Sequence, residues 1–367
     1  MITTTKTALA EALTLTGDIV ERRNTIPILQ NLLITRARAG LAVRMADLDV
    51  EATVHFAADA ALDFEAFTVP AYMLRDIVRK LADGAEISIR AASERNQSIT
   101  LRAGRSRFSL STLPGADFPE LPMEDAPFGF EIEAQTLAAG LRAVSFAIST
   151  EETRYYLNGV HMHPVEGGVM LVATDGHRLA KRFLPVQGVA DDMPGIIIPR
   201  KTVGIIDKVL PKSGTVSIAI SKSKIALTAG VVRVVSKLID GTFPDYRRVV
   251  PQSGPQQAEI DSTALKTAIE RVMAVLAGRG GVSFAFEGSQ LRLTARDPDG
   301  GEAEDCTDFS GTAALTIGLN GKYLLDALAH LPDGTLLLEM NDAGTPAILR
   351  ADGDHTENLI VIMPMRV

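Results

Sequence analysis

Residues 67–90 read FTVPAYMLRDIVRKLADGAEISIR, and this pattern returns as IIIPRKTVGIIDKVLPKSGTVSIA at 196–219 and as IGLNGKYLLDALAHLPDGTLLLE at 317–339. In each copy, apolar residues follow the fourth position of the stretch by four, seven and eleven places, which is the spacing of one face of an α-helix. A glycine then ends each helix, and an alternating apolar stretch predicts a β-strand. The three glycines are Gly84, Gly214 and Gly334.

Two further landmarks repeat with nearly the same spacing. The pair Leu9/Leu13 returns 128 residues later as Leu137/Leu141 and after another 128 as Leu265/Ile269, which predicts an earlier helix in each copy. The ending Phe118-Pro119 returns 125 residues later as Phe243-Pro244. We therefore predict three copies of one α+β unit, in which two helices pack on antiparallel sheets, with domain boundaries at 1–122, 123–252 and 253–367.

The composition limits the classes of function that are open to this chain. It has 367 residues, 46% of them apolar, which excludes a disordered chain, and its net charge of −8 argues against binding nucleic acid by bulk positive charge. The net charges of the three predicted domains are −1, +2 and −9. The last domain is therefore a candidate surface for a basic partner.

Catalytic and cofactor motifs are missing from the sequence. The single cysteine, Cys306, lies among acidic residues that disfavour a reactive thiolate, and GxGxxG, Walker A and HExxH motifs are absent, so we expect no cofactor, no metal and no catalytic residue. An acid/base pair at Asp175-Gly-His177 is the alternative enzymatic reading, but no nucleophile motif accompanies it. No apolar run is long enough to span a membrane, so we expect a cytoplasmic protein with no membrane partner.

Several local strings resemble those of a known family. They are GRSRFSLSTLP at 104–114, TRYYLNG at 153–159, ATDGHRL at 173–179, SKLIDGTFPDYRRV at 236–249 and MPMR at 363–366. Together they resemble the bacterial DNA polymerase III β subunit family, the sliding clamps. The resemblance implies a non-catalytic processivity factor whose three clamp domains form, with a second copy, a head-to-tail dimeric ring of six domains.

The resemblance implies that duplex DNA threads this ring without sequence preference and that the ring tethers DNA polymerase III. Strong phosphate contacts would slow sliding, so an acidic chain with scattered inward-facing bases is a sensible compromise. The candidate DNA-facing residues are Arg23, Arg79, Lys80, Arg154, Tyr155, Lys201 and Lys208. In the loop before the paired tyrosines, Glu151 and Glu152 work against a DNA contact.

The resemblance also implies a hydrophobic pocket for the short clamp-binding peptide of partner proteins, which carries apolar anchors and a Gln. Apolar side chains would form an adaptable wall, and Arg and His donors would fix the peptide's orientation. The C-terminal MPMR could equally be an edge strand of the last domain, and the two readings are compatible. The matching residues are Leu157, Thr174, Gly176, His177, Arg178, Leu179, Pro244, Arg248, Val249, Pro346, Val361, Met363, Pro364, Met365 and Arg366.

A dimer interface is predicted at the alternating segment 105–110, with arginines on one face and apolar residues on the other. Its candidate residues are Arg105, Arg107, Phe108 and Leu110, and the resemblance implies that they face Ala274, Val275, Asp299, Glu302 and Asp305 of a second copy. The expected partners are the DNA polymerase III α subunit, the clamp loader, repair polymerases and mismatch-repair proteins. The alternative within the family is a specialised clamp paralogue for repair, a mobile element or drug tolerance.

Overall fold

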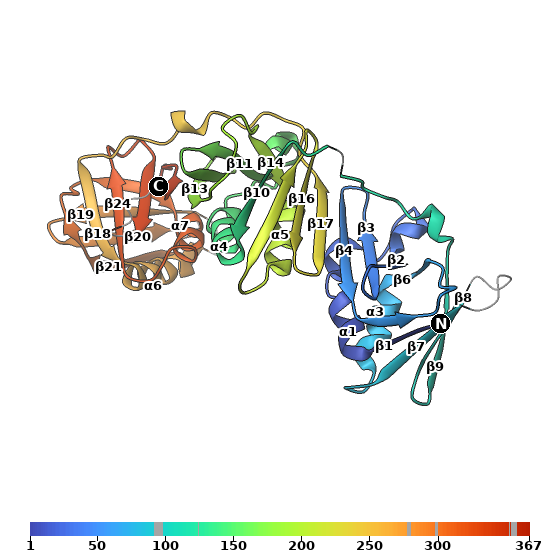
Figure 1. The fold of residues 1–367 in the computed structure, drawn as a ribbon. Helices are drawn as coiled ribbons and strands as arrows, with labels where there is room; N and C mark the ends of the chain where they lie inside the picture. The colour runs from blue at the N-terminus through green and yellow to red at the C-terminus, as the bar shows by residue number, and fades with distance from the viewer. Residues whose placement is uncertain (92–97, 124, 277–279, 298–299, 352, 354–357) are drawn as a thin grey trace. The chain divides into compact units, whose positions relative to one another are not determined.

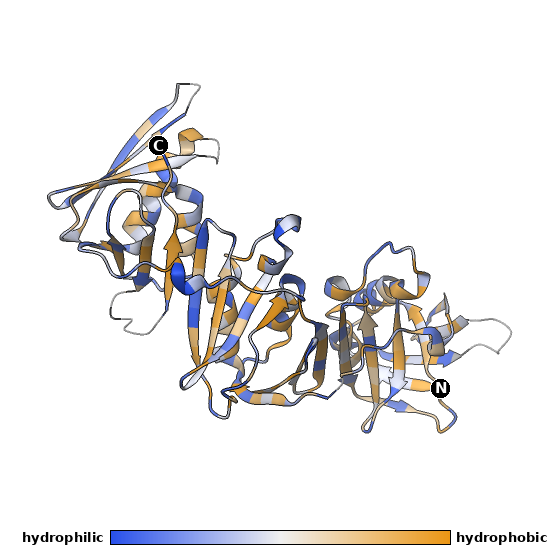
Figure 2. Cartoon of the chain, turned by 90° about the horizontal axis from the view of Figure 1, so that it is seen from above, coloured by the Kyte–Doolittle hydropathy of each residue, from blue (hydrophilic) through white to orange (hydrophobic). Residues whose placement is uncertain are grey.

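The structure is a computed structural model that describes residues 1–91, 98–123, 125–276, 280–297, 300–351, 353 and 358–367. It divides into two compact units (Figure 1): unit 1 contains Met1–Gln135 and Gly204–Leu238, and unit 2 contains Thr136–Val203 and Ile239–Val367. All pairings between the strands of the described residues are antiparallel, which confirms the predicted α+β class. Figure 2 shows the hydrophobic residues gathered along these strands.

Unit 1 contains two sheets. The larger has the order β10 (Phe128–Glu133), β15 (Thr215–Ile220), β16 (Lys224–Ala229), β17 (Val232–Lys237), β4 (Val50–Phe56), β3 (Leu41–Ala46), β2 (Asn31–Arg36) and β6 (Phe67–Pro70). The smaller has the order β5 (Ala58–Ala60), β1 (Ile2–Thr5), β7 (Glu86–Ala91), β8 (Ser98–Ala103) and β9 (Ser106–Ser111). In this second sheet β9 is an edge strand.

Three short helices of unit 1 pack against both of its sheets. They are α1 (Lys6–Ala12), α2 (Thr16–Ile19) and α3 (Ala71–Lys80), with 3₁₀ turns η1 (Pro27–Gln30) and η2 (Gly115–Asp117). Leu9 of α1 and Leu74 and Val78 of α3 are completely buried in one core with residues of both sheets. Burying each such side chain contributes about 2 kcal/mol, so this packing orders the short helices.

Unit 2 also contains two sheets. The larger has the order β14 (Ile196–Pro199), β11 (Gly159–Val165), β12 (Gly168–Thr174), β13 (Arg178–Pro185), β26 (Leu359–Ile362), β25 (Ala347–Ala351), β24 (Thr335–Met340), β18 (Gln256–Asp261) and β22 (Ser310–Gly311). The smaller has the order β21 (Glu302–Asp308), β20 (Gln290–Arg296), β19 (Gly281–Glu287) and β23 (Thr316–Asn320). Here β21 is an edge strand.

The remaining helices are α4 (Ala134–Ser145), α5 (Arg200–Val209), α6 (Ser262–Met273) and α7 (Gly321–Leu328), with 3₁₀ turns η3 (Glu152–Leu157), η4 (Tyr246–Arg248) and η5 (Ala274–Leu276). In α6, Asp261 caps the N-terminus by accepting a hydrogen bond from the Ala264 amide, and Leu265 and Ile269 are buried. Asn320 caps α7 in the same way. Among the described residues, no helix is both long and apolar enough to cross a membrane.

The predicted helices are present in all three copies, with one difference at their ends. The helices α3, α5 and α7 stop before the last apolar position of the pattern, so Leu81, Leu210 and Leu331 lie just beyond them. The three glycines adopt positive φ angles of 73°, 104° and 127° in the turn that leads to the next strand. The carbonyls of Gly214 and Gly334 accept hydrogen bonds from the first residues of α4 and α6.

The sheets continue across the predicted domain boundaries. In unit 1, β17 pairs with β4, so that Val234 lies opposite Ala52. In unit 2, β13 pairs with β26, so that Leu179 lies opposite Val361. Because β26 ends at Ile362 and has a neighbour on each side, the MPMR segment that follows it is not an edge strand. The exact boundaries at 122 and 252 stay a prediction.

Candidate functional site

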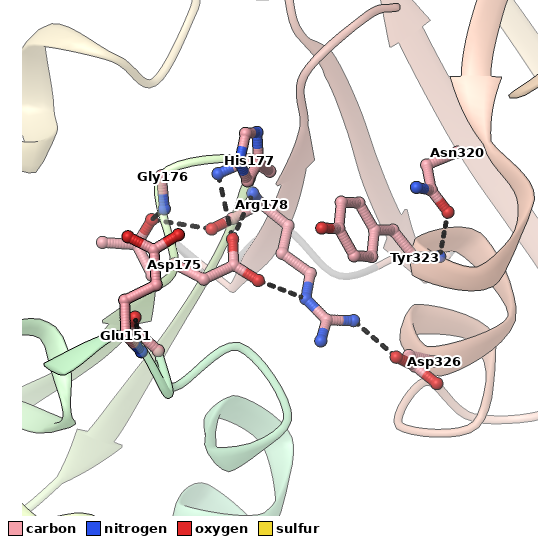
Figure 3. A network of polar contacts seen from close by, with 10 residues as sticks. Glu151, Asp175, Gly176, His177, Arg178, Asn320, Tyr323 and Asp326 are labelled. Carbon is pink, nitrogen blue, oxygen red and sulfur yellow. Dashed lines mark hydrogen bonds and ion pairs between the residues drawn. The ribbon is translucent and has the colours of Figure 1, made fainter. Parts of the chain in front are cut away.

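The turn between β12 and β13, residues 174–178, is held rigidly by its own side chains (Figure 3). The Asp175 carboxylate accepts hydrogen bonds from the backbone amides of His177 and Arg178, at 2.9 and 3.0 Å. The Thr174 hydroxyl accepts from the Gly176 amide at 3.1 Å and donates to the Arg178 carbonyl at 2.7 Å. Gly176 has a φ of 89°, which favours glycine at this position. The turn therefore presents an exposed His177 at a fixed position.

The Arg178 guanidinium lies at the centre of a polar network. Its Nε donates to Asp175 at 3.0 Å and its Nη1 donates to Asp326 of α7 at 2.7 Å. It also lies over the rings of Tyr323 and Phe146, at 4.6 and 5.3 Å from their centroids. Because two of its nitrogens donate to carboxylates on different elements, Arg178 joins β13 to α7. The same two carboxylates largely neutralise its charge.

Helix α7 contributes residues that the sequence analysis missed. Asn320, Tyr323 and Asp326 occur at intervals of three, which places them on one face of the helix, and this spacing was the available signal. The Tyr323 ring stacks on His177 at a centroid distance of 6.2 Å (Figure 3). Burial, followed by the nearby Asp175 carboxylate, raises the pKa of Tyr323. Tyr323 therefore stays a neutral, partly buried ring beside the turn.

The C-terminal segment 363–367 crosses from this turn to the small sheet of unit 2. The Met363 amide donates to the His177 carbonyl at 2.9 Å, and the Met365 amide donates to the Gly318 carbonyl at 2.8 Å. A Cβ atom on Gly318 would lie 2.2 Å from the Met365 carbonyl oxygen. Glycine at position 318 is therefore what lets the segment lie along β23.

Three apolar residues of the predicted pocket belong to one buried cluster. Leu157, Leu179 and Val361 are buried together with Phe243 and Tyr246. The register of β25 and β26 pairs Ala347 with Ile362, so Pro346 is next to Met363 across the strands. Pro244, Arg248 and Val249 are exposed on the segment after Phe243, and Pro364 and Arg366 follow Met363 in the tail. The turn and this cluster bring together seven of the fifteen residues predicted for the pocket, and their binding role stays a prediction.

Several large apolar side chains are exposed on the segments that supply this site. Within the described part of unit 2, the large hydrophobic residues that are exposed are Tyr155, Val249, Met363, Met365 and Val367. All five come from the segments that the sequence analysis assigned to the site or that flank it. An exposed apolar side chain such as Met363 beside a rigid turn is typical of a surface that binds another protein.

The predicted DNA-facing residues have different surroundings. Arg23, Arg79 and Lys80 of unit 1 are exposed, as is Lys201 at the start of α5. Lys208 forms a close ion pair with Asp18 of α2. Tyr155 is 53% exposed. Arg154 pairs with Glu151 at 3.4 Å, and a Cβ atom on Gly176 would lie 2.8 Å from its Nη1, so Arg154 lies beside the turn of the candidate site.

The predicted interface residues lie on two edge strands. In β9, Arg107 is exposed and Phe108 is half-buried, and Arg105 is exposed just before it. Leu110 is buried in the core of its own unit, so its side chain is not available to a second copy.

The other edge strand, β21, is rich in acids. Glu302 and Asp305 pair with Arg296 and Arg271 at 2.8 and 2.9 Å, and Ala274 and Val275 lie in the neighbouring turn η5. Asp299, also predicted at the interface, lies outside the described residues.

The geometry does not support the enzymatic reading. The Asp175 carboxylate binds the backbone amide of His177, not its imidazole, and its remaining contact is with Arg178. An acid that does not touch the ring cannot orient or polarise it as a base. In the ranges that the structure describes, no group of three or more His, Cys, Asp or Glu side chains is placed to hold a metal ion.

Comparisons with known proteins agree along the whole chain. Three models of the DNA polymerase III beta subunit match it: the N-terminal domain at residues 1–122, the central domain at 131–245 and the C-terminal domain at 247–366. The beta sliding clamp of Caulobacter vibrioides is 36% identical over 374 residues, covering 100% of both chains. That of Escherichia coli K12 is 36% identical over 352 residues, covering 94% of each.

Solved structures give the same result. A sliding clamp (DNA polymerase III subunit beta) from Bartonella birtlesii, bound to griselimycin, has a TM-score of 0.93 and 40% identity and covers 100% of this chain and 99% of its own. The DNA polymerase III subunit beta from Pseudomonas aeruginosa has a TM-score of 0.94 and 34% identity, with 100% of both chains covered.

Proposed function

The chain belongs to the DNA polymerase III beta subunit family, the beta sliding clamps, and from that premise we propose how it closes around DNA and where its partners bind. It is a DNA sliding clamp, a processivity factor of replication that is not an enzyme. Similarity to curated clamps over the full length does not favour a specialised paralogue.

Two copies of the chain close the ring through β9 of one copy and β21 of the other. An edge strand leaves a row of backbone donors and acceptors for a second strand. The exposed arginines at 105 and 107 are opposite in charge to the acids of β21, of which Glu302, Glu304 and Asp305 also form ion pairs within their own chain. This charge complementarity supports a head-to-tail homodimer, because like edges repel one another.

Duplex DNA is held inside this ring by topology. With a net charge of −8, the chain lacks the excess of positive charge that proteins use to grip DNA phosphates. The exposed Arg23, Arg79, Lys80 and Lys201 supply a modest number of phosphate contacts. Weak contacts of this kind allow the ring to slide.

Partner proteins bind at the turn 174–178, the segment 243–249 and the C-terminal segment 363–367. The observation that carries this assignment is that the exposed Met363 is hydrogen-bonded to the rigid turn, while Val249 and Met365 are also exposed on the other two segments. Met side chains adapt to several partners. We assign the site to short peptides of the polymerase α subunit, the clamp loader, repair polymerases and mismatch-repair proteins, in the cytoplasm.

Retention on DNA tests the ring. The protein is loaded on a nicked circular plasmid with a bacterial clamp loader and ATP, and the plasmid is then cut once with a restriction enzyme. We expect the protein to leave the linear DNA while it stays on the uncut circle. Retention on linear DNA at the same salt concentration would contradict topological binding and indicate ordinary contacts.

A further inference from the structure

Two histidines lie beneath the segment 243–249, which carries part of the peptide site. His161 and His163 are two positions apart in β11, so their rings lie on the same face of the sheet, with centroids 5.1 Å apart. The His161 ring stacks on Phe243 at 4.7 Å, with an angle of 7° between the planes. His163 Nε2 lies 3.0 Å from the Tyr246 hydroxyl. Each histidine therefore holds one residue of the segment above it.

The segment divides into residues that face inward and residues that face outward. Phe243 and Tyr246 are 9% and 7% exposed and contact the histidines. Pro244, Arg248 and Val249 are exposed and belong to the predicted peptide site. A shift of either buried ring would move the exposed residues with it, because all of them lie within seven consecutive residues.

The hydrogen bonds identify the protonated nitrogen of each ring. Nδ1 of His161 lies 3.1 Å from the Ile196 carbonyl, and Nδ1 of His163 lies 2.9 Å from the Pro164 carbonyl. A carbonyl accepts, so both Nδ1 atoms carry the hydrogen. Nε2 of His163 is then free to accept the Tyr246 hydroxyl hydrogen.

The surroundings keep the pair neutral. Burial is the main cause that lowers the pKa of His161 to about 4, with His163 and Arg247 adding to the effect. Burial also lowers the pKa of His163, with Arg247 and Lys181 as further causes. The Tyr246 hydroxyl is the other titratable group in contact with the pair.

We infer that His161 and His163 are positioning residues for the peptide site: as a neutral pair, they set the position of the segment 243–249 from beneath. This inference rests on the proposed peptide-binding function. It assigns a role to a face of β11 that does not contact the peptide, and it makes peptide affinity depend on one buried hydrogen bond and one ring stack.

A substitution that removes a single oxygen atom tests the hydrogen bond. The probe is a fluorescein-labelled synthetic peptide with one Gln, two large apolar residues and blocked ends. We expect Tyr246→Phe to weaken its binding about threefold to tenfold at pH 7.5, the range that corresponds to one net hydrogen bond. The matched control is Tyr156→Phe. Tyr156 packs on the same apolar cluster, and the structure of the described residues shows no hydrogen bond of its hydroxyl.

A double-mutant cycle separates positioning from general destabilisation. His163→Phe should weaken peptide binding to the same extent as Tyr246→Phe, and the double variant should be no weaker than either single one. His163→Gln, whose amide oxygen can accept the tyrosine hydrogen, should recover most of the affinity. Unchanged affinity in Tyr246→Phe, or additive losses in the double variant, would overturn the inference.

A pH series tests whether the pair is neutral. The double variant His177→Gln with His330→Gln removes the exposed histidine of the turn and the exposed histidine that stacks on Phe146, so that neither titrates near the site. Its peptide affinity should then be constant from pH 7.5 to 5.5, and a large loss in this interval would contradict the inference. If the unmodified protein does not bind this peptide, the proposed peptide site itself is wrong, which is a different result from a variant that binds normally.

Discussion

Arg178 and Arg248 are both predicted to orient a bound peptide, and the structure gives them opposite surroundings. The Arg178 side chain is 12% exposed and bonds two carboxylates on different elements. The Arg248 side chain is 84% exposed and pairs with Asp245, three residues away. A buried ion pair is costly to break, whereas an exposed pair contributes little to stability.

We expect Arg178→Ala to lower the free energy of unfolding by about 2–4 kcal/mol. The reason is that Asp175, whose side chain is 17% exposed, would keep its charge without its partner. The control Arg248→Ala should change stability by less than about 0.5 kcal/mol. Urea denaturation at pH 7.5 measures both variants. An equal decrease in the free energy of unfolding in both variants would show that the Arg178 ion pairs do not stabilise the contact between β13 and α7.

The two methionines of the C-terminal segment should carry much of the peptide affinity. Met363 and Met365 are 41% and 38% exposed, so their side chains are available to a ligand. The double variant Met363→Ala with Met365→Ala should abolish measurable binding of the labelled peptide and leave dimerisation unchanged. Fluorescence anisotropy and sedimentation measure the two properties. A peptide affinity equal to that of the unmodified protein would exclude this segment from the site.

At the residue scale, the sequence predicted segments that the structure brings together, such as the turn 174–178 and Met363, but not the contacts of each side chain. Tyr323 and Asp326 were missed because their spacing of three indicates a shared helix face but does not reveal that α7 meets the turn 174–178. The role of Arg178 also depended on this contact, which joins residues 148 positions apart. Contacts of such long separation leave no periodic signal in the sequence.

The edge strand β9 has one apolar residue in the core of its own unit and another that is partly exposed. Leu110 is 2% exposed and belongs to the core of unit 1, whereas Phe108, on the same face, is half-buried. Ser109 is exposed on the opposite face. Phe108 is therefore the apolar residue of β9 with surface left for a second copy.

We expect Phe108→Ala to raise the dissociation constant of the dimer by at least about tenfold, as is typical for truncation of a central aromatic residue in an interface. Ser109→Ala is the matched control on the other face of the strand and should leave the dimer unchanged. Sedimentation equilibrium measures both. A dissociation constant that does not change in Phe108→Ala would remove this residue from the proposed interface.

At the element scale, helices and strands could be predicted because their periodicities are local. The starts of α3 and α5 fall directly after Pro70 and Pro199, where the sequence pattern placed them. The pairing of β17 with β4 and of β13 with β26 could not be predicted, because strands from different copies can pair in many registers. The sheets therefore cross the boundaries that the repeat suggested.

At the scale of the whole molecule, the buried histidine pair predicts a loss of stability in acid. The pKa of His161 is lowered from 6.5 to about 4, so between these values the unfolded chain binds a proton that the folded chain does not. The free energy of unfolding is therefore unaffected by this group above pH 7. It decreases as the pH falls from 6.5 towards 4, because the unfolded chain takes up the proton first.

By pH 5 this loss amounts to about 2 kcal/mol. The variant His161→Phe, which cannot take up the proton, should lose less stability between pH 7.5 and 5 than the unmodified protein. Urea unfolding at a series of pH values measures the difference. Identical pH dependence in the two proteins would show that His161 is not the group responsible.

The uneven charge of the molecule could be predicted from the sequence, because net charge is a property of composition alone. Part of the excess of acidic residues in 253–367 lies on one strand, because Glu302, Glu304, Asp305 and Asp308 all belong to β21. The position of this strand at a sheet edge could not be read from composition. It follows from the pairing of β21 with β20 on one side.

The opposite charges of β9 and β21 also limit how assembly can go wrong. Each copy carries one strand of each kind, so every joint between copies has the same direction. A joint of this kind closes into a ring if the angles allow it and otherwise continues as an open filament. Under the proposed pairing, a substitution that changes the angle between successive copies but keeps the contact between β9 and β21 would give long fibres and a viscous solution instead of single chains.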